Sequence, residues 1–326
     1  RILHLALATT LLGSLVAAFY LGWSAEHDSL PSEAPRLQDQ LLDYLRLTKP
    51  PIIVLLMITA FGSMFLAAKG VPQPSVMLTV LIGGSMAAGG ASALNHVLER
   101  NSDAMMRRTR RRPVASNRVP PGRATVFGLG LNCVAFMIFV VGANPLSAFL
   151  SIAASAFYVI IYTLWLKRST HQNIVIGGAA GAFPPIVGWA AVTGDVTWSP
   201  IILFAIIFIW TPPHFWALAL YKKGDYEKAG VPMMPVVAGL KKTKQQILFY
   251  TILLAPLGVC PTIFGMASWS YGILAGLLGL IFVCLATAIF CDKGEFYARK
   301  TFAFSILYLF LLFAGLIVDH AVKMAG

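Results

Sequence analysis

The stretch "PSVMLTVLIGGSMAAGGASALNHVLERNSDAMMRRTRRRP", residues 74–113, indicates the class of fold. Its first part, residues 74–98, is almost entirely apolar or small, and a helix needs about 20 such residues to cross a bilayer. A helix of a soluble protein carries polar residues along one whole face, whereas here the charged residues begin only where the apolar run ends. The stretch therefore predicts a membrane-spanning helix that ends in a charged cluster.

The composition of the whole chain agrees with this class. Its 326 residues are 58% hydrophobic and 12% charged, whereas an average soluble domain has about 25% charged residues. Apolar runs long enough to span a bilayer occur at 2–23, 51–68, 74–98, 124–142, 145–166, 173–193, 199–221, 245–266, 269–291 and 300–322. We therefore predict an all-α, polytopic membrane helix bundle with nine core transmembrane helices and one extra N-terminal helix.

The distribution of basic residues gives the orientation. The net charge of +12 would by itself suit a nucleic-acid partner. However, nearly all lysines and arginines lie in every second connection, at 24–50, 99–123, 167–172, 222–244 and 292–300. Basic loops of membrane proteins stay in the cytoplasm. Because topology already accounts for the positive charge, we expect the lipid bilayer and no nucleic acid as a partner.

The N-terminal residues allow two interpretations. Residues 1–25 have the charged start and apolar core of a signal peptide, or they form a real transmembrane helix. Cleavage would place Arg36, Arg46 and Lys49 outside the cell, against the distribution of basic loops. We therefore predict an extra N-terminal helix over 1–25, a polar linker over 26–43 and a membrane domain over 44–326.

The end of the 74–98 helix carries a first candidate site. Asn95, Glu99 and Asp103 are four residues apart, so they line one face of a helix over about 12 Å. Amide and carboxylate oxygens are ligands that Mg²⁺ prefers. The arginines that follow match phosphate oxygens bidentately; they are Arg107, Arg108 and the run Arg110–Arg112. A solvated helix end held by charge pairs is the competing interpretation. Because acids at the end of an intramembrane helix usually have a function, we favour a Mg²⁺–diphosphate site.

A second candidate segment is "WTPPHFWALALYKKGDYEKAGVPMMP", residues 210–235. Its two prolines lie inside a predicted span, where they loosen the backbone and are typical of a cavity. His214 follows them directly, and the residues alone leave open whether it is a hydrogen-bonded core residue or a pocket residue. The predicted helix ends on the cytoplasmic side with Lys222, Lys223, Asp225 and Tyr226.

Four stretches resemble the intramembrane prenyltransferase superfamily: "LTKPPI" (47–52), "NHVLERNSDAMMRRTRRRP" (95–113), "TPPHFWALAL" (211–220) and "DYEKAGVPMMPV" (225–236). The resemblance covers essentially all of 41–322, and the last two stretches are similar to its heme-modifying branch. It implies an enzyme that transfers the farnesyl group of farnesyl diphosphate to a vinyl group of heme b, giving heme O, with Mg²⁺ as cofactor. It also implies a bacterial inner or plasma membrane, an active site facing the cytoplasm, and heme A synthase as a fused or associated partner.

The resemblance also assigns residues. It implies that the catalytic, Mg²⁺-binding residues are Asn95, Glu99, Asp103 and Asp225, and that phosphate contacts come from Arg107, Arg108, Lys222 and Lys223. We add Lys49, His214 and Tyr226 as candidate substrate contacts. For Lys49, an anchor at the cytoplasmic face is an equal alternative. Tyr162, Trp165, Phe215 and Trp216 are candidates for an aromatic lining. The chain has "ERNSD" at 99–103 where the superfamily typically has "DRDID", so Glu99 is one methylene longer and Asn101 lacks a charge.

Two other functions compete with heme farnesylation. A quinone precursor or a chlorophyllide is the acceptor in other branches of the same superfamily. A transporter would instead carry its polar residues at mid-membrane on broken helices, whereas the acidic residues here cluster at one membrane face. We therefore consider the transporter the weaker alternative.

Overall fold

The computed structural model describes residues 37–292 and 294–323. The predicted extra helix at 1–25 and most of the predicted linker lie outside the described residues. The last part of that linker range, 37–43, belongs to helix α2, Leu37–Thr48. The division of the chain into extra helix, linker and membrane domain stays a prediction.

In the described part of the chain, nine helical segments are long and apolar enough to cross a membrane. No strand occurs in this part, so the predicted all-α membrane bundle with nine core spans is confirmed. The spans are α3 (Pro50–Ala67), α4 (Pro74–Leu98), α6 (Pro121–Gly142), α7 (Pro145–Ala156) with η1 (Phe157–Leu166) and α8 (Lys167–Ser169), α9 (Asn173–Ala182) with α10 (Pro184–Thr193), α11 (Trp198–Tyr221), α14 (Gly239–Ile263), α15 (Trp269–Cys291) and α16 (Phe296–Lys323).

Proline marks the start of many of these helices. Pro50, Pro74, Pro121, Pro145 and Pro184 each occupy the first helical position. Proline is favoured there because its missing N–H would have no intrahelical partner and its φ already suits a helix. Five helices therefore begin at the position where proline is best accommodated.

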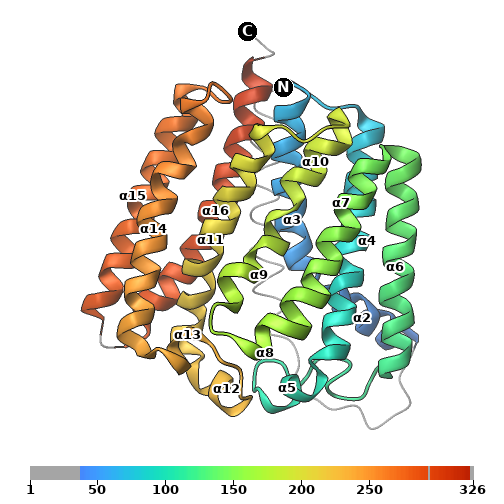
Figure 1. Ribbon diagram of the computed structural model, residues 1–326, viewed down its shortest axis with the longest axis vertical. Coiled ribbons are helices and arrows are strands. Elements are labelled where there is room, and N and C mark those ends of the chain that lie inside the picture. The colour runs from blue at the N-terminus through green and yellow to red at the C-terminus, as the bar shows by residue number, and fades with distance from the viewer. Residues whose placement is uncertain (1–36, 293, 324–326) are drawn as a thin grey trace.

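The short helices lie at one end of the bundle. Figure 1 shows α5 (Arg100–Met105), α8, α12 (Lys223–Lys228) and α13 (Met234–Val237) together at the lower end. They belong to the basic connections 99–123, 167–172 and 222–244. The fold thus collects the residues of both candidate segments at a single end of the molecule.

The bundle has its main apolar core between α3, α11, α15 and α16. Ile58, Leu203, Phe282, Tyr308 and Phe313 are buried members of this cluster. Figure 1 shows α14 and α15 on one side of the molecule and α4 and α6 on the other. The packed centre thus joins α11, which carries the second candidate segment, to α3, α15 and α16.

Small residues let α4 and α6 approach closely. A Cβ added at Gly90 would lie 2.6 Å from the carbonyl oxygen of Gly128, and one added at Gly128 would lie 2.9 Å from the carbonyl oxygen of Gly90. Glycine at such crossings allows backbone contact in membranes, where van der Waals packing replaces the hydrophobic drive. Both positions therefore require glycine.

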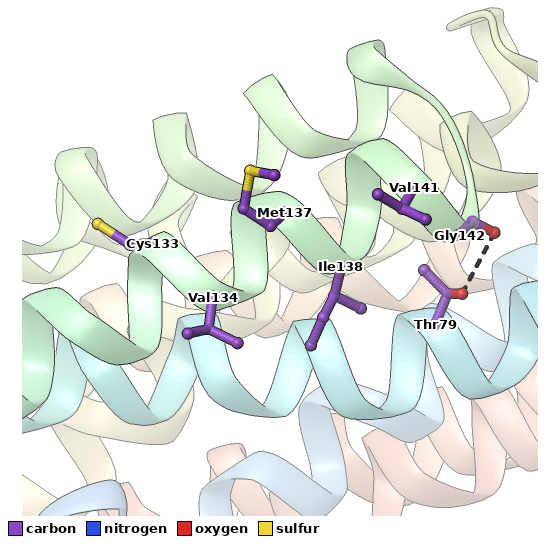
Figure 2. Close-up of a pocket in the computed structure, with 7 residues that line it drawn as sticks. All are labelled: Thr79, Cys133, Val134, Met137, Ile138, Val141 and Gly142. Atoms are coloured by element: carbon purple, nitrogen blue, oxygen red, sulfur yellow. Dashed lines mark hydrogen bonds between the residues drawn. The ribbon is translucent and has the colours of Figure 1, made fainter.

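A shallow apolar groove lies along α4 and α6 (Figure 2). It has a volume of about 550 Å³ and is lined by Thr79, Cys133, Val134, Met137, Ile138, Val141 and Gly142. Its one polar side chain is already satisfied, because the Thr79 hydroxyl donates to the Ser75 carbonyl at 2.9 Å and contacts that of Gly142 at 3.2 Å. Val141 is 82% exposed, as expected for a surface that faces lipid. The groove therefore carries no acid–base chemistry.

Candidate active site

The three residues of the first motif are buried at the end of α4. Asn95, Glu99 and Asp103 are 2%, 6% and 1% exposed. The Lys49 ammonium donates to Asn95 Oδ1 at 3.0 Å, and Asn95 Nδ2 donates to the Thr163 hydroxyl at 3.2 Å. Burial argues against the competing interpretation of a solvated helix end. The motif is instead a polar row inside the protein.

Lys49 reaches this row from the junction of α2 and α3. Its backbone adopts the left-handed conformation, with φ 54° and ψ 61°. That conformation is uncommon for a residue with a side chain, and the α-helical region is disfavoured before a proline such as Pro50. The junction therefore breaks the helix at Lys49, and the amine meets the amide of Asn95 at a sequence distance of 46 residues.

Two further cations neutralise the carboxylates. Lys167 Nζ lies 2.5 Å from Glu99 Oε1, and Arg112 Nη1 lies 2.7 Å from Asp103 Oδ2 and 4.0 Å from Glu99 Oε2. A buried carboxylate without such a partner would cost several kcal/mol. The second oxygen of Asp103, Oδ1, is buried and has no hydrogen-bond partner in the described part of the chain. One buried oxygen of the row thus has no protein partner among the described residues.

The charges shift the protonation of the site in opposite directions. Burial by itself would raise the pKa of Glu99, but Lys167, followed by Lys49 and Arg112, lowers this pKa below its ordinary value. Glu99 is therefore ionised at neutral pH. Burial and the nearby Arg112 lower the pKa of Lys49 well below its usual range, against the opposing effect of Glu99 and Asp103.

A π-helix completes this side of the site. The Thr163 hydroxyl, which contacts Asn95, donates to the carbonyl of Tyr158 at 2.8 Å, five residues back along η1. Such wide turns occur mostly as short segments at functional sites. Tyr162, on the same turn, lies beside Lys167, whose Nζ is 5.9 Å from the centre of the Tyr162 ring. The predicted aromatic candidate Tyr162 is therefore next to the cation that pairs with Glu99.

The second motif folds back towards the first. Tyr226 is buried in an apolar cluster with Met233 and Met234, and Met106 from the loop after α5 packs in the same cluster. Asp225 lies beside Tyr226 and is partly buried. The two loops, which are more than 100 residues apart in sequence, thus share one small core.

The predicted ligands do not form a complete metal cage. Within residues 37–292 and 294–323, no group of three or more His, Cys, Asp or Glu side chains is placed to hold a metal ion. Glu99 and Asp103 are instead joined by Arg112. The assignment of Asn95, Glu99, Asp103 and Asp225 as ligands stays a prediction.

The four basic residues predicted to contact phosphate do not contact the carboxylates of the first motif. Arg107 and Arg108 are exposed, and Lys222 and Lys223 contact the Tyr221 ring and Glu227. Arg112 and Lys167 contact the carboxylates, and Lys49 contacts the amide oxygen of Asn95. The sequence placed Arg112 in the arginine run after the first motif, but it did not single out Lys167 as a site residue. A signal for Lys167 was present, because "LKR" (166–168) ends a span on the basic side, but this pattern also follows from topology alone.

His214 lies on α11 and is buried. Its Nδ1 is 2.6 Å from the hydroxyl of Ser305 on α16, and its ring stacks between Trp210 at 4.3 Å and Phe302 at 4.7 Å. α11 continues through Pro212 and Pro213 without interruption. The Nδ1 atom of His214 is therefore hydrogen-bonded, whereas its Nε2 atom has no hydrogen-bond partner among the described residues.

The fold and the buried polar row together define a class of intramembrane enzyme, and sequence comparison identifies it. The UbiA prenyltransferase family matches residues 55–313, so the chain belongs to this family. The membership confirms the predicted enzyme class, a prenyltransferase.

Particular relatives are heme enzymes. The chain is 49% identical to protoheme IX farnesyltransferase of Gloeobacter violaceus, over 87% of this chain and 94% of that protein. It is 48% identical to the enzyme of the same name from Rhizobium rhizogenes, over 87% and 91%. With the protoheme IX farnesyltransferase of Roseiflexus castenholzii it shares 43% identity over 99% of this chain, which spans 63% of that longer protein. The predicted resemblance to the heme-modifying branch is confirmed.

Solved structures share the fold at low identity. A structure of digeranylgeranylglyceryl phosphate synthase has a TM-score of 0.72 at 17% identity, covering 87% of this chain and 99% of that chain. A UbiA homolog from Archaeoglobus fulgidus, bound to GPP and Mg²⁺, has a TM-score of 0.64 at 13% identity, covering 84% and 99%. These likenesses support the intramembrane helix-bundle architecture.

Proposed function

We propose that this chain transfers the farnesyl group of farnesyl diphosphate to a vinyl group of heme b, giving heme O. The observation that carries the proposal is the buried row of Asn95, Glu99 and Asp103, which is surrounded by three cations. Oxygen ligands beside fixed positive charges suit a metal-bound diphosphate. The heme acceptor is supported by the relatives, which are named protoheme IX farnesyltransferase.

The donor set fits Mg²⁺. Amide and carboxylate oxygens are the ligands of this ion, and Asp103 Oδ1 is a buried acceptor without a partner in the described structure. Asn95, Glu99 and Asp103 would hold the metal from one side, and Asp225 from the second loop. When bound, Mg²⁺ would neutralise the diphosphate and make it a better leaving group.

The basic residues stabilise the charge that develops on the leaving group. The C1–O bond of farnesyl diphosphate breaks, and its electron pair stays on the diphosphate. Arg112 and Lys167 contact the carboxylates, and Lys49 contacts the amide oxygen of Asn95. Fixed donors in a water-poor site stabilise such charge more than bulk water does. We infer that these three side chains turn from Asn95, Glu99 and Asp103 to the diphosphate.

The aromatic residues of η1 protect the resulting allylic cation. The rings of Tyr158 and Tyr162 are 5.6 Å apart, and aromatic faces attract cations. The heme vinyl group attacks C1, which forms a carbon–carbon bond and leaves a cation on the vinyl carbon next to the porphyrin. Water then adds to that carbon and loses a proton, which gives the hydroxyethylfarnesyl side chain.

The orientation and partners belong to the same proposal. Both motifs lie at the end of the bundle with the basic connections (Figure 1), which supports a site open to the cytoplasm in a bacterial inner membrane. Heme A synthase is the enzyme expected to consume heme O, as a fused or associated partner. A quinone precursor or chlorophyllide is the alternative acceptor.

One assay tests the proposal. Detergent-solubilised protein is incubated with heme b, farnesyl diphosphate and Mg²⁺, and heme O is detected by mass. We expect product from the wild type and an at least 100-fold slower reaction from Asp103→Asn, which removes one ligand charge while keeping the shape. Asp195→Asn, at an exposed position in the connection between α10 and α11, is the matched control and should retain activity. Prenylation of 4-hydroxybenzoate without any heme O would overturn the choice of acceptor.

A further inference from the structure

Ser305 determines which nitrogen of His214 carries the proton. The Ser305 hydroxyl is 2.6 Å from the carbonyl oxygen of Phe302 and 2.6 Å from His214 Nδ1. A carbonyl only accepts, so the single hydroxyl proton is donated to Phe302. Ser305 Oγ must then accept from the N–H at Nδ1. In a neutral imidazole the other nitrogen, Nε2, is left with its lone pair free.

The surrounding rings fix the direction of this lone pair. His214 is nearly parallel to Trp210 and Phe302, at interplanar angles of 17° and 24°, and Phe215 contacts it edge-on. Trp210 is itself anchored, because its Nε1 donates to the Ser305 carbonyl at 2.8 Å. Ser305 thus hydrogen-bonds to both Trp210 and His214, which stack on each other. Only the Nε2 edge of the imidazole is left uncovered by these contacts.

His96 provides a contrast within the same chain. Both of its ring nitrogens are enclosed and without a partner in the described residues. Nε2 of His214 has no partner in residues 37–292 and 294–323 either, but this atom is not fully enclosed. An oriented imidazole with one anchored Nδ1–H and one open Nε2 is the arrangement found in metal-ligating histidines.

We propose that Ser305 is a positioning residue for the acceptor: it holds His214 in the tautomer and orientation in which Nε2 coordinates the iron of heme b. This inference rests on the proposed function. Coordination fixes the porphyrin relative to the protein, and with it the position of the vinyl group that attacks the farnesyl cation. Partners of this kind contribute about 10- to 100-fold to metal affinity.

The test uses the full chain in detergent, without farnesyl diphosphate, titrated with heme b and followed by its absorption spectrum. We expect the wild type to show a histidine-ligated heme spectrum and His214→Ala to lose it. Ser305→Ala should weaken heme binding about 10-fold and shift the spectrum, whereas Ser305→Thr, which keeps the hydroxyl, should restore both. Binding of Mg²⁺ and inorganic pyrophosphate should stay unchanged in all of these variants.

Thr301→Val is the matched control. Thr301 is also fully buried on α16, one turn before Ser305, and its hydroxyl has no partner in the described structure. Its removal should leave the heme spectrum and the melting temperature unchanged. A wild-type spectrum and affinity in Ser305→Ala, combined with loss in His214→Ala, would overturn the role of Ser305 alone. A wild type that neither binds heme b nor forms heme O would overturn the proposed function and this inference together.

Discussion

At the scale of single residues, the site depends on which cation meets which carboxylate. Lys167 and Arg168 are adjacent and carry the same charge, but only Lys167 reaches Glu99. Arg168 is exposed and donates to the carbonyl of Leu98. The charge of a residue is visible in the sequence, whereas its partner depends on the direction of its side chain from the end of η1.

This pair gives a residue-scale prediction. Lys167→Gln removes the charge beside Glu99, and we expect kcat/KM for farnesyl diphosphate to fall about 100-fold, as when one donor to a developing anion is lost. Arg168→Gln removes one positive charge from the same turn and should change kcat/KM by less than about two-fold. Steady-state heme O formation measures both. Equal effects of the two substitutions would show that Lys167 contributes only to the general positive potential.

At the scale of elements, the π-helix η1 and helix α9 fit together at one glycine. A Cβ added at Gly177 would lie 2.1 Å from Cδ2 of Tyr162. The missing side chain at Gly177 leaves room for the Tyr162 ring. Tyr162 directly precedes Thr163, the partner of Asn95. The wide turn could not be predicted from the apolar sequence of 157–166, because hydrophobicity is the same in α- and π-helices.

Gly177→Ala tests this fit. The added methyl displaces the Tyr162 ring, and overpacking of this kind costs about 1–3 kcal/mol. We expect a lower melting temperature in detergent and an about 10-fold loss of heme O formation. Gly181→Ala is the control on the same helix, because a Cβ there meets nothing within 4 Å. Wild-type activity in Gly177→Ala would contradict a role for the Tyr162 position.

At the scale of the whole molecule, the loops of both candidate segments meet at one end of the bundle. Figure 1 shows the loops after α4 and α11 at the end opposite the connection between α10 and α11. Odd and even connections lie on opposite sides because each of the nine spans crosses once. The orientation proposed from the basic loops therefore determines from which side farnesyl diphosphate enters.

Single cysteines test this orientation. In a variant whose four cysteines are replaced by alanine, Asp195→Cys should react with a membrane-impermeant maleimide in intact spheroplasts. Arg110→Cys, exposed in the loop after α5, should react only after permeabilisation. Mass shift of the labelled protein is the measurement. The reverse pattern would place both motifs outside the cell and contradict the positive-inside assignment.

The sequence by itself determined the nine described spans, their alternating sides and the row of Asn95, Glu99 and Asp103. These features depend on local properties, namely the length of apolar runs matched to the bilayer and a helical spacing of four residues. The resemblance also indicated the family and the second motif. These features were predictable because each depends on the residues of one continuous segment.

Only the tertiary structure decided the partners of these residues. The contact of Asn95 with Thr163 joins residues 68 positions apart, and that of His214 with Ser305 joins residues 91 positions apart. Lys167 and Arg112 contact the carboxylates in place of the expected Arg107 and Arg108. Such contacts depend on how helices cross and rotate against one another. Because packing fixes that rotation and the local pattern does not encode it, the electrostatics of the site emerged only in the folded bundle.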